Sequence, residues 1–229
     1  MILSLLLIGF FIGMRHALEA DHVAAIASLA TRSSNMKHTV WQGAVWGIGH
    51  TLTLFIFGSI VLMADSVIPE QFAEFLEFAV GLMLIGLGTD VLWHLYKKRV
   101  HFHVHQHDAV QHFHAHSHVG EDNHAISKHH HEHRFPKRAL YIGLMHGMAG
   151  SAALIILTLQ TVQSTAIGIL YILLFGTGSI IGMAVLSLII AIPFRCSSSN
   201  LTWLYNSLHM IVGISTILLG SVTTYNYLA

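Results

Sequence analysis

The apolar residues of this chain fall into long continuous blocks, unlike the short periodic runs of a soluble protein. A bilayer core of about 30 Å requires about 20 apolar residues for each helix that crosses it. Six blocks are long enough, and they cover residues 2–30, 40–63, 71–96, 138–162, 165–194 and 200–226. The pattern therefore predicts an all-α integral membrane protein with six transmembrane helices.

Composition supports a membrane protein and divides the chain into three parts. Of the 229 residues, 54% are hydrophobic and only 10% are charged, whereas a soluble domain usually carries about 25% charged residues. Residues 97–137 are polar and of low complexity, so they cannot cross a bilayer. They separate a first three-helix unit, residues 1–96, from a second, residues 138–229. We expect the segment between them to be a disordered loop.

The two units share a pattern of glycines at an offset near 130 residues. A unit of three helices is odd, so its second copy crosses the membrane in the opposite direction. This is the inverted-repeat plan of many secondary transporters, which bind their substrate near the midplane between the repeats. The matches are Gly13-Met14-Arg15-His16 with Gly143-Leu144-Met145-His146, Gly47-Ile48-Gly49 with Gly176-Thr177-Gly178, and Val80-Gly81 and Leu87-Gly88 with Val212-Gly213 and Leu219-Gly220.

Basic residues of the connecting segments gather on one side of the predicted membrane region. The segments after the first, third and fifth helices contain Lys and Arg, whereas the opposite side carries Asp65 and Glu70 instead. Because cytoplasmic loops carry an excess of Lys and Arg, we expect the long loop in the cytoplasm and both termini outside.

The first helix contains an unusual concentration of ionisable residues. Ionisable groups inside a span are costly and usually mark a substrate pathway. Imidazole and carboxylate donors suit nickel, cobalt, copper(II) or zinc, and they suit potassium or calcium poorly. We expect His16, Asp21 and His22 to bind a transition-metal ion, with Glu19 as a further candidate ligand.

The spacing of these residues is incompatible with a straight helix. At 100° per residue, Asp21 lies about 140° from His16, and His22 lies about 120° in the other direction. Either the helix is unwound near Gly13, or its polar residues face different partners.

Other helices offer residues that could complete the site. His50 and His146 lie next to glycines that allow close approach, and we expect both to join the site. Asp90 lies at a similar depth. For His94 and His209 the expected role is an interhelical hydrogen bond.

The long loop is rich in histidine, in alternating and consecutive arrangements that are typical of metal-binding segments. We expect it to buffer metal ions beside the pore. The residues concerned are His101, His103, His105, His107, His112, His114, His116, His118, His129, His130, His131 and His133.

Several function classes are disfavoured. The single cysteine, Cys196, excludes a disulfide framework and a thiolate cluster within one chain. The formal net charge is zero, which gives no general attraction to nucleic acid. The chain has no P-loop, and its one His-Glu pair, His131-Glu132, does not continue into His-Glu-x-x-His. We expect no enzymatic activity and no prosthetic group.

Three segments resemble the nickel/cobalt transporter family. Residues 15–22 resemble its RHAxDADH signature, and residues 49–51 resemble its second-helix motif. Residues 146–151 are similar to the HGxAGS segment of its UreH-like, urease-accessory permease branch. Two departures are Glu19, where many relatives have Asp, and six predicted spans, where the larger permeases have eight.

The resemblance implies permeation of Ni²⁺ or Co²⁺ across a bacterial cytoplasmic membrane, with the ion as substrate, to supply urease or hydrogenase. A cytoplasmic nickel chaperone is then a candidate partner besides the ion and the bilayer. We expect uptake; efflux of Ni²⁺ or Co²⁺ is the first alternative and an intramembrane metal-dependent hydrolase the second. The sequence does not define the oligomeric state.

Overall fold

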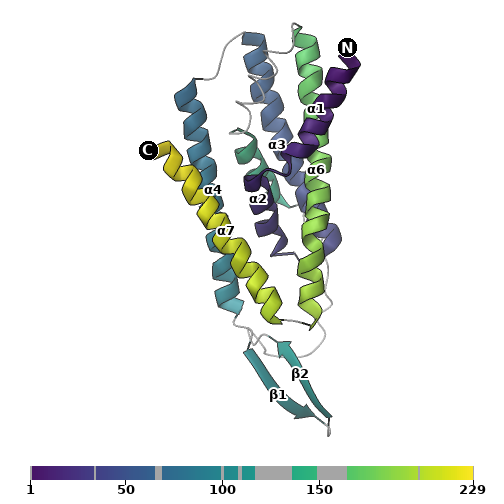
Figure 1. Cartoon of the computed structure of the whole chain (residues 1–229), viewed down its shortest axis with the longest axis vertical. Coiled ribbons are helices and arrows are strands. Elements are labelled where there is room, and N and C mark those ends of the chain that lie inside the picture. The colour runs from purple at the N-terminus through teal and green to yellow at the C-terminus, as the bar shows by residue number, and fades with distance from the viewer. Residues whose placement is uncertain are drawn as a thin grey trace.

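The computed structural model describes residues 2–33, 35–64, 69–98, 101–107, 110–116, 136–148, 164–200 and 202–228. Its main body is a bundle of long helices with a small two-stranded hairpin at one end (Figure 1). The helices are α1 (Ile2–His16), α2 (Ala20–Ala30), α3 (Met36–Ala64), α4 (Glu70–Lys98), α6 (Thr165–Asn200) and α7 (Thr202–Leu228), and residues 137–148 are also helical.

The described helices agree with five of the six predicted spans. Helices α3, α4, α6 and α7 are each long and apolar enough to cross a membrane, and the bent pair α1 and α2 passes the same test as one unit. Of the predicted span 138–162, the structure describes the helical beginning, and the remainder lies outside the described residues. The chain is thus a multi-pass helical membrane protein.

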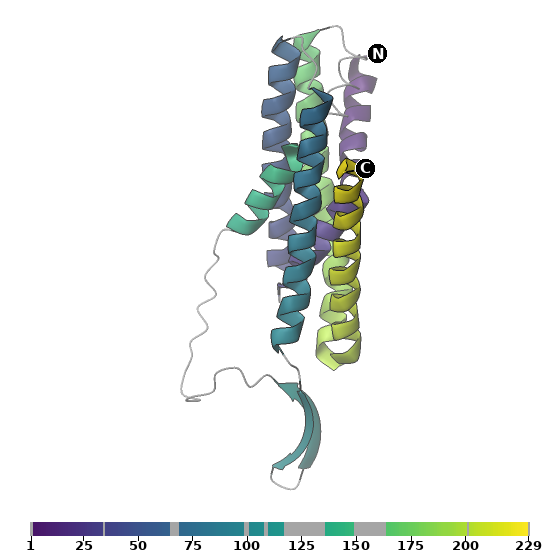
Figure 2. The ribbon, with the colours of Figure 1, turned by 90° about the vertical axis from the view of Figure 1, so that its left-hand side faces the viewer.

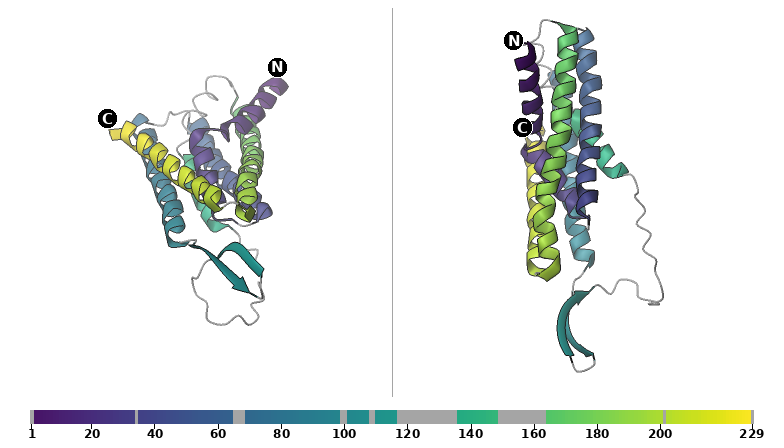
Figure 3. Two further views of the ribbon diagram at one scale, coloured as in Figure 1. Left: turned by 60° about the horizontal axis from the view of Figure 1, so that its bottom comes forward. Right: turned by 90° about the vertical axis from the view of Figure 1, so that its right-hand side faces the viewer.

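The long helices pack as two groups with α2 between them; α4 is antiparallel to α7 and α3 to α6, whereas α1 runs parallel to α6. Helix α4 packs along α7, and α6 packs along both α3 and α1. The short helix α2 contacts α6, α7 and α4, so it occupies the interior of the bundle (Figures 1 and 3). Both termini lie toward the end of the bundle that is remote from the hairpin (Figure 2).

Glycines bring α4 and α7 into close contact. A Cβ added to Gly81 would lie 2.9 Å from the Gly220 oxygen, and one added to Gly88 would lie 2.6 Å from the Gly213 oxygen. Neither helix could approach so closely with a larger residue at these positions. In the sequence repeat, Gly81 corresponds to Gly213 and Gly88 to Gly220. The two contacts are therefore reciprocal: Gly81 packs on the counterpart of Gly88, and Gly88 packs on the counterpart of Gly81.

Contacts around the first helix of each unit are reciprocal in the same way. Gly13 on α1 packs on the carbonyl group of Phe175 in α6. Its repeat counterpart, Gly143, packs on the carbonyl group of Trp46 in α3. Each unit thus inserts its first helix against the second helix of the other unit.

The first span is broken between α1 and α2, and the two helices meet at 54°. Leu18 and Glu19 donate their backbone N–H groups to Arg15 and His16, three residues back, so the regular i to i−4 ladder stops. Glu19 is extended, with φ −63° and ψ 147°, and it caps the start of α2. A distortion of this helix was predicted, but it lies at residues 17–19, one turn beyond Gly13.

Strands β1 (His101–His107) and β2 (Val110–His116) form an antiparallel hairpin beyond the end of α4. A disordered loop was expected over residues 97–137, so these two strands were not anticipated. Residues 117–135 of that loop lie outside the described part of the chain.

Candidate metal centre

Four histidines from four different segments meet inside the bundle. His16 ends α1, His22 lies in the first turn of α2, His50 lies midway along α3, and His146 lies in the helical segment 137–148. The last three are at most 2% exposed. The His22 ring is central, with its centroid 4.4 Å from His16, 5.1 Å from His50 and 4.3 Å from His146.

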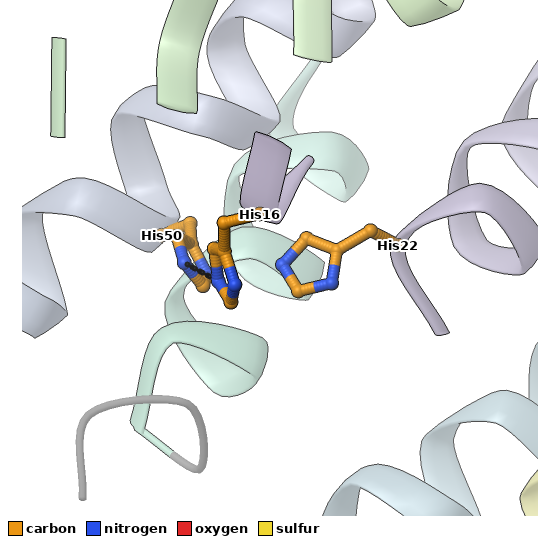
Figure 4. A group of neighbouring side chains, drawn as sticks. All are labelled: His16, His22 and His50. Carbon is orange, nitrogen blue, oxygen red and sulfur yellow. Dashed lines mark hydrogen bonds between the residues drawn. The ribbon is translucent and has the colours of Figure 1, made fainter. Parts of the chain in front are cut away.

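The first group of potential ligands comprises His16, His22 and His50 (Figure 4). One nitrogen of each ring lies within 4.8 Å of the others. The Nε2 atoms of His16 and His50 are 3.2 Å apart. Two nitrogens bound to one ion at about 2.1 Å, with angles of about 90–110°, would lie about 3.0–3.4 Å apart. In the structure this contact is a hydrogen bond between the two rings, and its length also matches the spacing of two ligands of one ion, which would replace the shared proton.

A second group adjoins the first and shares one member with it. Asp21, His22 and His146 also place one ligand atom each within 4.8 Å of the others. This group combines two nitrogens with one oxygen, whereas the first is all nitrogen. Because His22 belongs to both, the two groups form one continuous cluster of potential ligand atoms.

Carboxylates fix the proton on three of the rings. Glu19 accepts from His16 Nδ1 at 2.8 Å, and Asp21 accepts from His22 Nδ1 at 2.9 Å and from His146 Nε2 at 3.0 Å. A neutral imidazole that donates through one nitrogen presents a lone pair on the other. Carboxylate-oriented imidazoles of this kind are the usual arrangement of metal-binding histidines.

Three of the remaining ring nitrogens are buried and unpaired among the described residues. Within the described residues, His22 Nε2, His50 Nδ1 and His146 Nδ1 have no hydrogen-bond partner. Buried polar atoms are normally paired because an unsatisfied one costs about 1–3 kcal/mol. A cation that accepts their lone pairs would remove that cost.

The break in the first span brings its polar residues to one place. His16 precedes the break, and Asp21 and His22 follow it at the start of α2. Asp21 is held there because its Oδ1 also accepts the backbone N–H of His22 at 2.8 Å. The bend at residues 17–19 therefore overcomes the angular mismatch of a straight helix.

Two aromatic residues that sequence reasoning missed line the centre. The buried Trp46 ring lies 5.2 Å from the His22 ring and 5.5 Å from the His146 ring. Phe175 lies 5.3 Å from the His16 ring. The sequence feature that could have identified them is their equivalent position in the repeat: Trp46 directly precedes Gly47, and Phe175 directly precedes Gly176.

The remaining candidates have other partners. Glu19, expected as a further ligand, lies outside both ligand groups and binds His16. Asp90 pairs with Arg32 and with Arg138, so it joins three segments away from the centre.

His209 shows the interhelical role that was expected of it. Its ring contacts the carbonyl oxygen of Tyr205 on α7 at 2.8 Å and that of Thr31, the C-cap residue of α2, at 3.2 Å.

The hairpin arranges part of the histidine-rich loop. Its register opposes three pairs of histidines across the strands, His101 with His116, His103 with His114 and His105 with His112. The described residues also include His107. His118, His129, His130, His131 and His133 lie outside the described part of the chain.

Relatives of known name match most of the chain. It is 35% identical over 229 residues to the urease accessory protein UreH of Bacillus sp. (strain TB-90), which covers 98% of this chain and 92% of that protein. It is 25% identical over 196 residues to a Methanocaldococcus jannaschii protein named "Putative nickel/cobalt efflux system", covering 81% and 77% of the two chains. Neither a protein-family model nor a solved structure matches.

A more distant likeness reaches plants. The Arabidopsis thaliana chloroplast protein FOR GROWTH AND FERTILITY 2 is 25% identical over 177 residues, which cover 76% of this chain and 44% of that protein.

The apolar bundle and its buried histidines define a multi-pass membrane protein with a candidate transition-metal centre. By its relatives, the chain belongs to the nickel/cobalt transporter family, in the branch that includes UreH. The family resemblance of its motifs is thereby confirmed. UreH is named an accessory protein and the Methanocaldococcus jannaschii relative an efflux system, which agrees with a chain that is not an enzyme.

Proposed function

We propose that this protein is a permease that carries Ni²⁺ or Co²⁺ into the cytoplasm through the buried His/Asp centre. The observation that carries the proposal is the set of three imidazoles, His16, His22 and His50, whose ligand atoms converge inside an apolar bundle. Nitrogen-rich sites with a neighbouring carboxylate suit divalent nickel and cobalt and suit alkali or alkaline-earth ions poorly. The ion is the substrate of this site, and no prosthetic group is required.

The two ligand groups suggest a route. An ion held by His16, His22 and His50 moves to Asp21 and His146 while His22 stays bound. Each step then exchanges some ligands and retains one, so the ion is never stripped of all its donors inside the membrane. Because bare dications are very costly in a low-dielectric medium, retention of a shared ligand lowers the barrier.

We further propose six spans arranged as a 3+3 inverted repeat, residues 1–96 and 138–229. The exchanged contacts of Gly81 with Gly220 and of Gly88 with Gly213 support it, because a two-fold axis within the membrane plane requires such reciprocal pairs. The histidines of the centre come from both units, which agrees with a substrate site at the repeat interface.

The proposed orientation has the hairpin in the cytoplasm and both termini outside. The distribution of Lys and Arg supports it. In this orientation the inside-negative membrane potential draws a cation inward, worth about 4.6 kcal/mol for a dication at 100 mV. The histidine-rich loop then stands at the exit, where it buffers incoming ions before a nickel chaperone accepts them.

Nickel accumulation tests this function. Cells that express the chain should accumulate more nickel and become more sensitive to it, whereas cells that express His22→Ala should match cells without the protein. Efflux is the second candidate because one relative is named an efflux system. Lower accumulation with greater resistance would favour efflux. Unchanged accumulation, with the protein verified in the membrane, would contradict both.

A further inference from the structure

Ser179 on α6 carries a buried hydroxyl without a partner. The residue has no exposed surface, and its Oγ has no hydrogen-bond partner among the described residues. Helical Ser and Thr hydroxyls often donate to the carbonyl four residues earlier, as Thr216 and Thr224 do on α7. The Ser179 hydroxyl makes no such bond and remains available to another acceptor or donor.

The neighbours of Ser179 fix the direction in which it lies. Gly178 and Gly182 on the same helix pack on α1, whereas Gly176 and Ile180 contact α3. At 100° per residue, the first two lie about 100° and 60° to one side of Ser179, and the other two lie about 60° and 100° to the other side. Ser179 therefore faces the space between α1 and α3.

That space is where His16 of α1 meets His50 of α3, with 3.2 Å between their Nε2 atoms. Phe175, one helical turn before Ser179, packs its ring 5.3 Å from His16. Thr51, the residue after His50, donates to the Gly176 carbonyl at 3.1 Å. These contacts set α6 at the level of the two histidines.

The repeat also relates Ser179 to a histidine. Gly47 packs on Ile180, and its counterpart Gly176 packs on Thr51. These two contacts are reciprocal between the units, like those between α4 and α7. The offset that takes Gly47 to Gly176 takes Thr51 to Ile180, and it takes His50 to Ser179. Ser179 thus holds in the second unit the position that His50 holds in the first.

We propose that Ser179 is a further ligand position of the metal centre, its hydroxyl oxygen entering the coordination shell of the ion beside His16 and His50. The inference rests on the proposed transport function and adds a residue to its site. A neutral hydroxyl binds nickel or cobalt more weakly than an imidazole. Serine at this position leaves one side of the ion weakly held, and release from the first ligand group is faster as a result.

The direct test replaces the hydroxyl by a thiol and uses Co²⁺ as the probe. Ser179→Cys in a Cys196→Ser background leaves one thiol in the chain. Purified full-length protein is saturated with Co²⁺, and a thiolate bound to the ion produces a near-ultraviolet charge-transfer band. We expect this band for Ser179→Cys, because the substitution is nearly isosteric and a thiolate is a strong ligand.

Ser187 supplies a matched control. It lies two turns further along α6 and is buried, and its Oγ also has no partner in the part of the chain that the structure describes, but it packs on Gly43 instead of the histidines. Ser187→Cys should show no such band. If Ser179→Cys lacks the band although the ligand-field bands of histidine-bound Co²⁺ are present, Ser179 is no ligand position.

A second variant tests the proposal if the Ser179→Cys protein does not fold. Ser179→Ala should raise the nickel concentration for half-maximal transport about fivefold, as expected for the loss of one modest polar contact, and Ser187→Ala should not. An unchanged value for Ser179→Ala would overturn the proposal. A wild-type chain that neither transports nickel nor binds Co²⁺ would instead refute the proposed function itself.

Discussion

Asp21 and His146, 125 residues apart in the chain, meet at 3.0 Å across the interior of the bundle. The same carboxylate also binds His22, so one aspartate orients two imidazoles from different halves of the protein. Both of its oxygens accept hydrogen bonds from these rings, and the other nitrogens, His22 Nε2 and His146 Nδ1, have no partner among the described residues. The orientations of these two rings are thus fixed by the protein's own hydrogen bonds, as a preorganised ligand site requires.

His22 is the residue that the two ligand groups share, so its loss should be the most damaging. His22→Ala should weaken nickel binding by at least about 100-fold, since even residues that only orient a ligand are worth about 10–100-fold, and it should abolish transport. His209→Gln is the matched control, because His209 is equally buried but bonds carbonyl groups of Thr31 and Tyr205. Equal loss of transport in both variants would show that buried histidines matter here for folding alone.

Glu19 should act through His16. Removal of its charge in Glu19→Gln weakens the hydrogen bond that holds the His16 ring, so the half-saturating nickel concentration should rise about tenfold while transport persists. Glu74→Gln, an exposed change on α4, should leave it unchanged. A complete loss of transport in Glu19→Gln would mean that Glu19 binds the ion directly.

The α4–α7 contact should tolerate no side chain at Gly88. A leucine there would collide with the backbone of Gly213 and force the helices apart, at a cost of about 3 kcal/mol. Gly86 has nothing within 4 Å of an added Cβ, so Gly86→Leu should be neutral. The unfolding temperatures of purified Gly88→Leu and Gly86→Leu in detergent, compared with that of the wild type, measure both effects. Equal unfolding temperatures would contradict the packing described for these helices.

The histidine-rich loop should regulate supply and not form the pathway. Deletion of residues 101–133 should leave transport at saturating nickel within about twofold of wild type, because no residue of the buried centre is removed. At limiting nickel the rate should fall more, since the buffering imidazoles are gone. A loop deletion as severe as His22→Ala would place the essential site in the loop.

The sequence predicted the membrane helices well because a long apolar block has few alternatives in a bilayer. It also indicated a distorted first helix as one of two ways in which His16, Asp21 and His22, which cannot share one face of a straight helix, could serve one site. It could not locate the break, because residues 17–19 contain neither proline nor glycine and the change of direction depends on tertiary packing of α2 against its neighbours.

The aromatic residues of the centre were harder to foresee. Trp46 and Phe175 read as ordinary apolar residues of long helices, and only their equivalent places in the two units distinguish them. Strands β1 and β2 were not predicted because alternating histidines indicate metal binding more strongly than they indicate strands. The roles of the carboxylates likewise depend on distances that spacing alone cannot give.

The most direct measurement of the central claim is the X-ray absorption spectrum of nickel bound to the buried centre. The sample is the chain without residues 101–133, loaded with one equivalent of Ni²⁺. The deletion excludes nickel that is bound to the histidines of the loop. Three imidazole nitrogens at about 2.1 Å should surround the ion, and His50→Ala should reduce them to two. A spectrum with oxygen ligands and no imidazole, or one that His16→Ala, His22→Ala and His50→Ala all leave unchanged, would contradict the assignment of this centre.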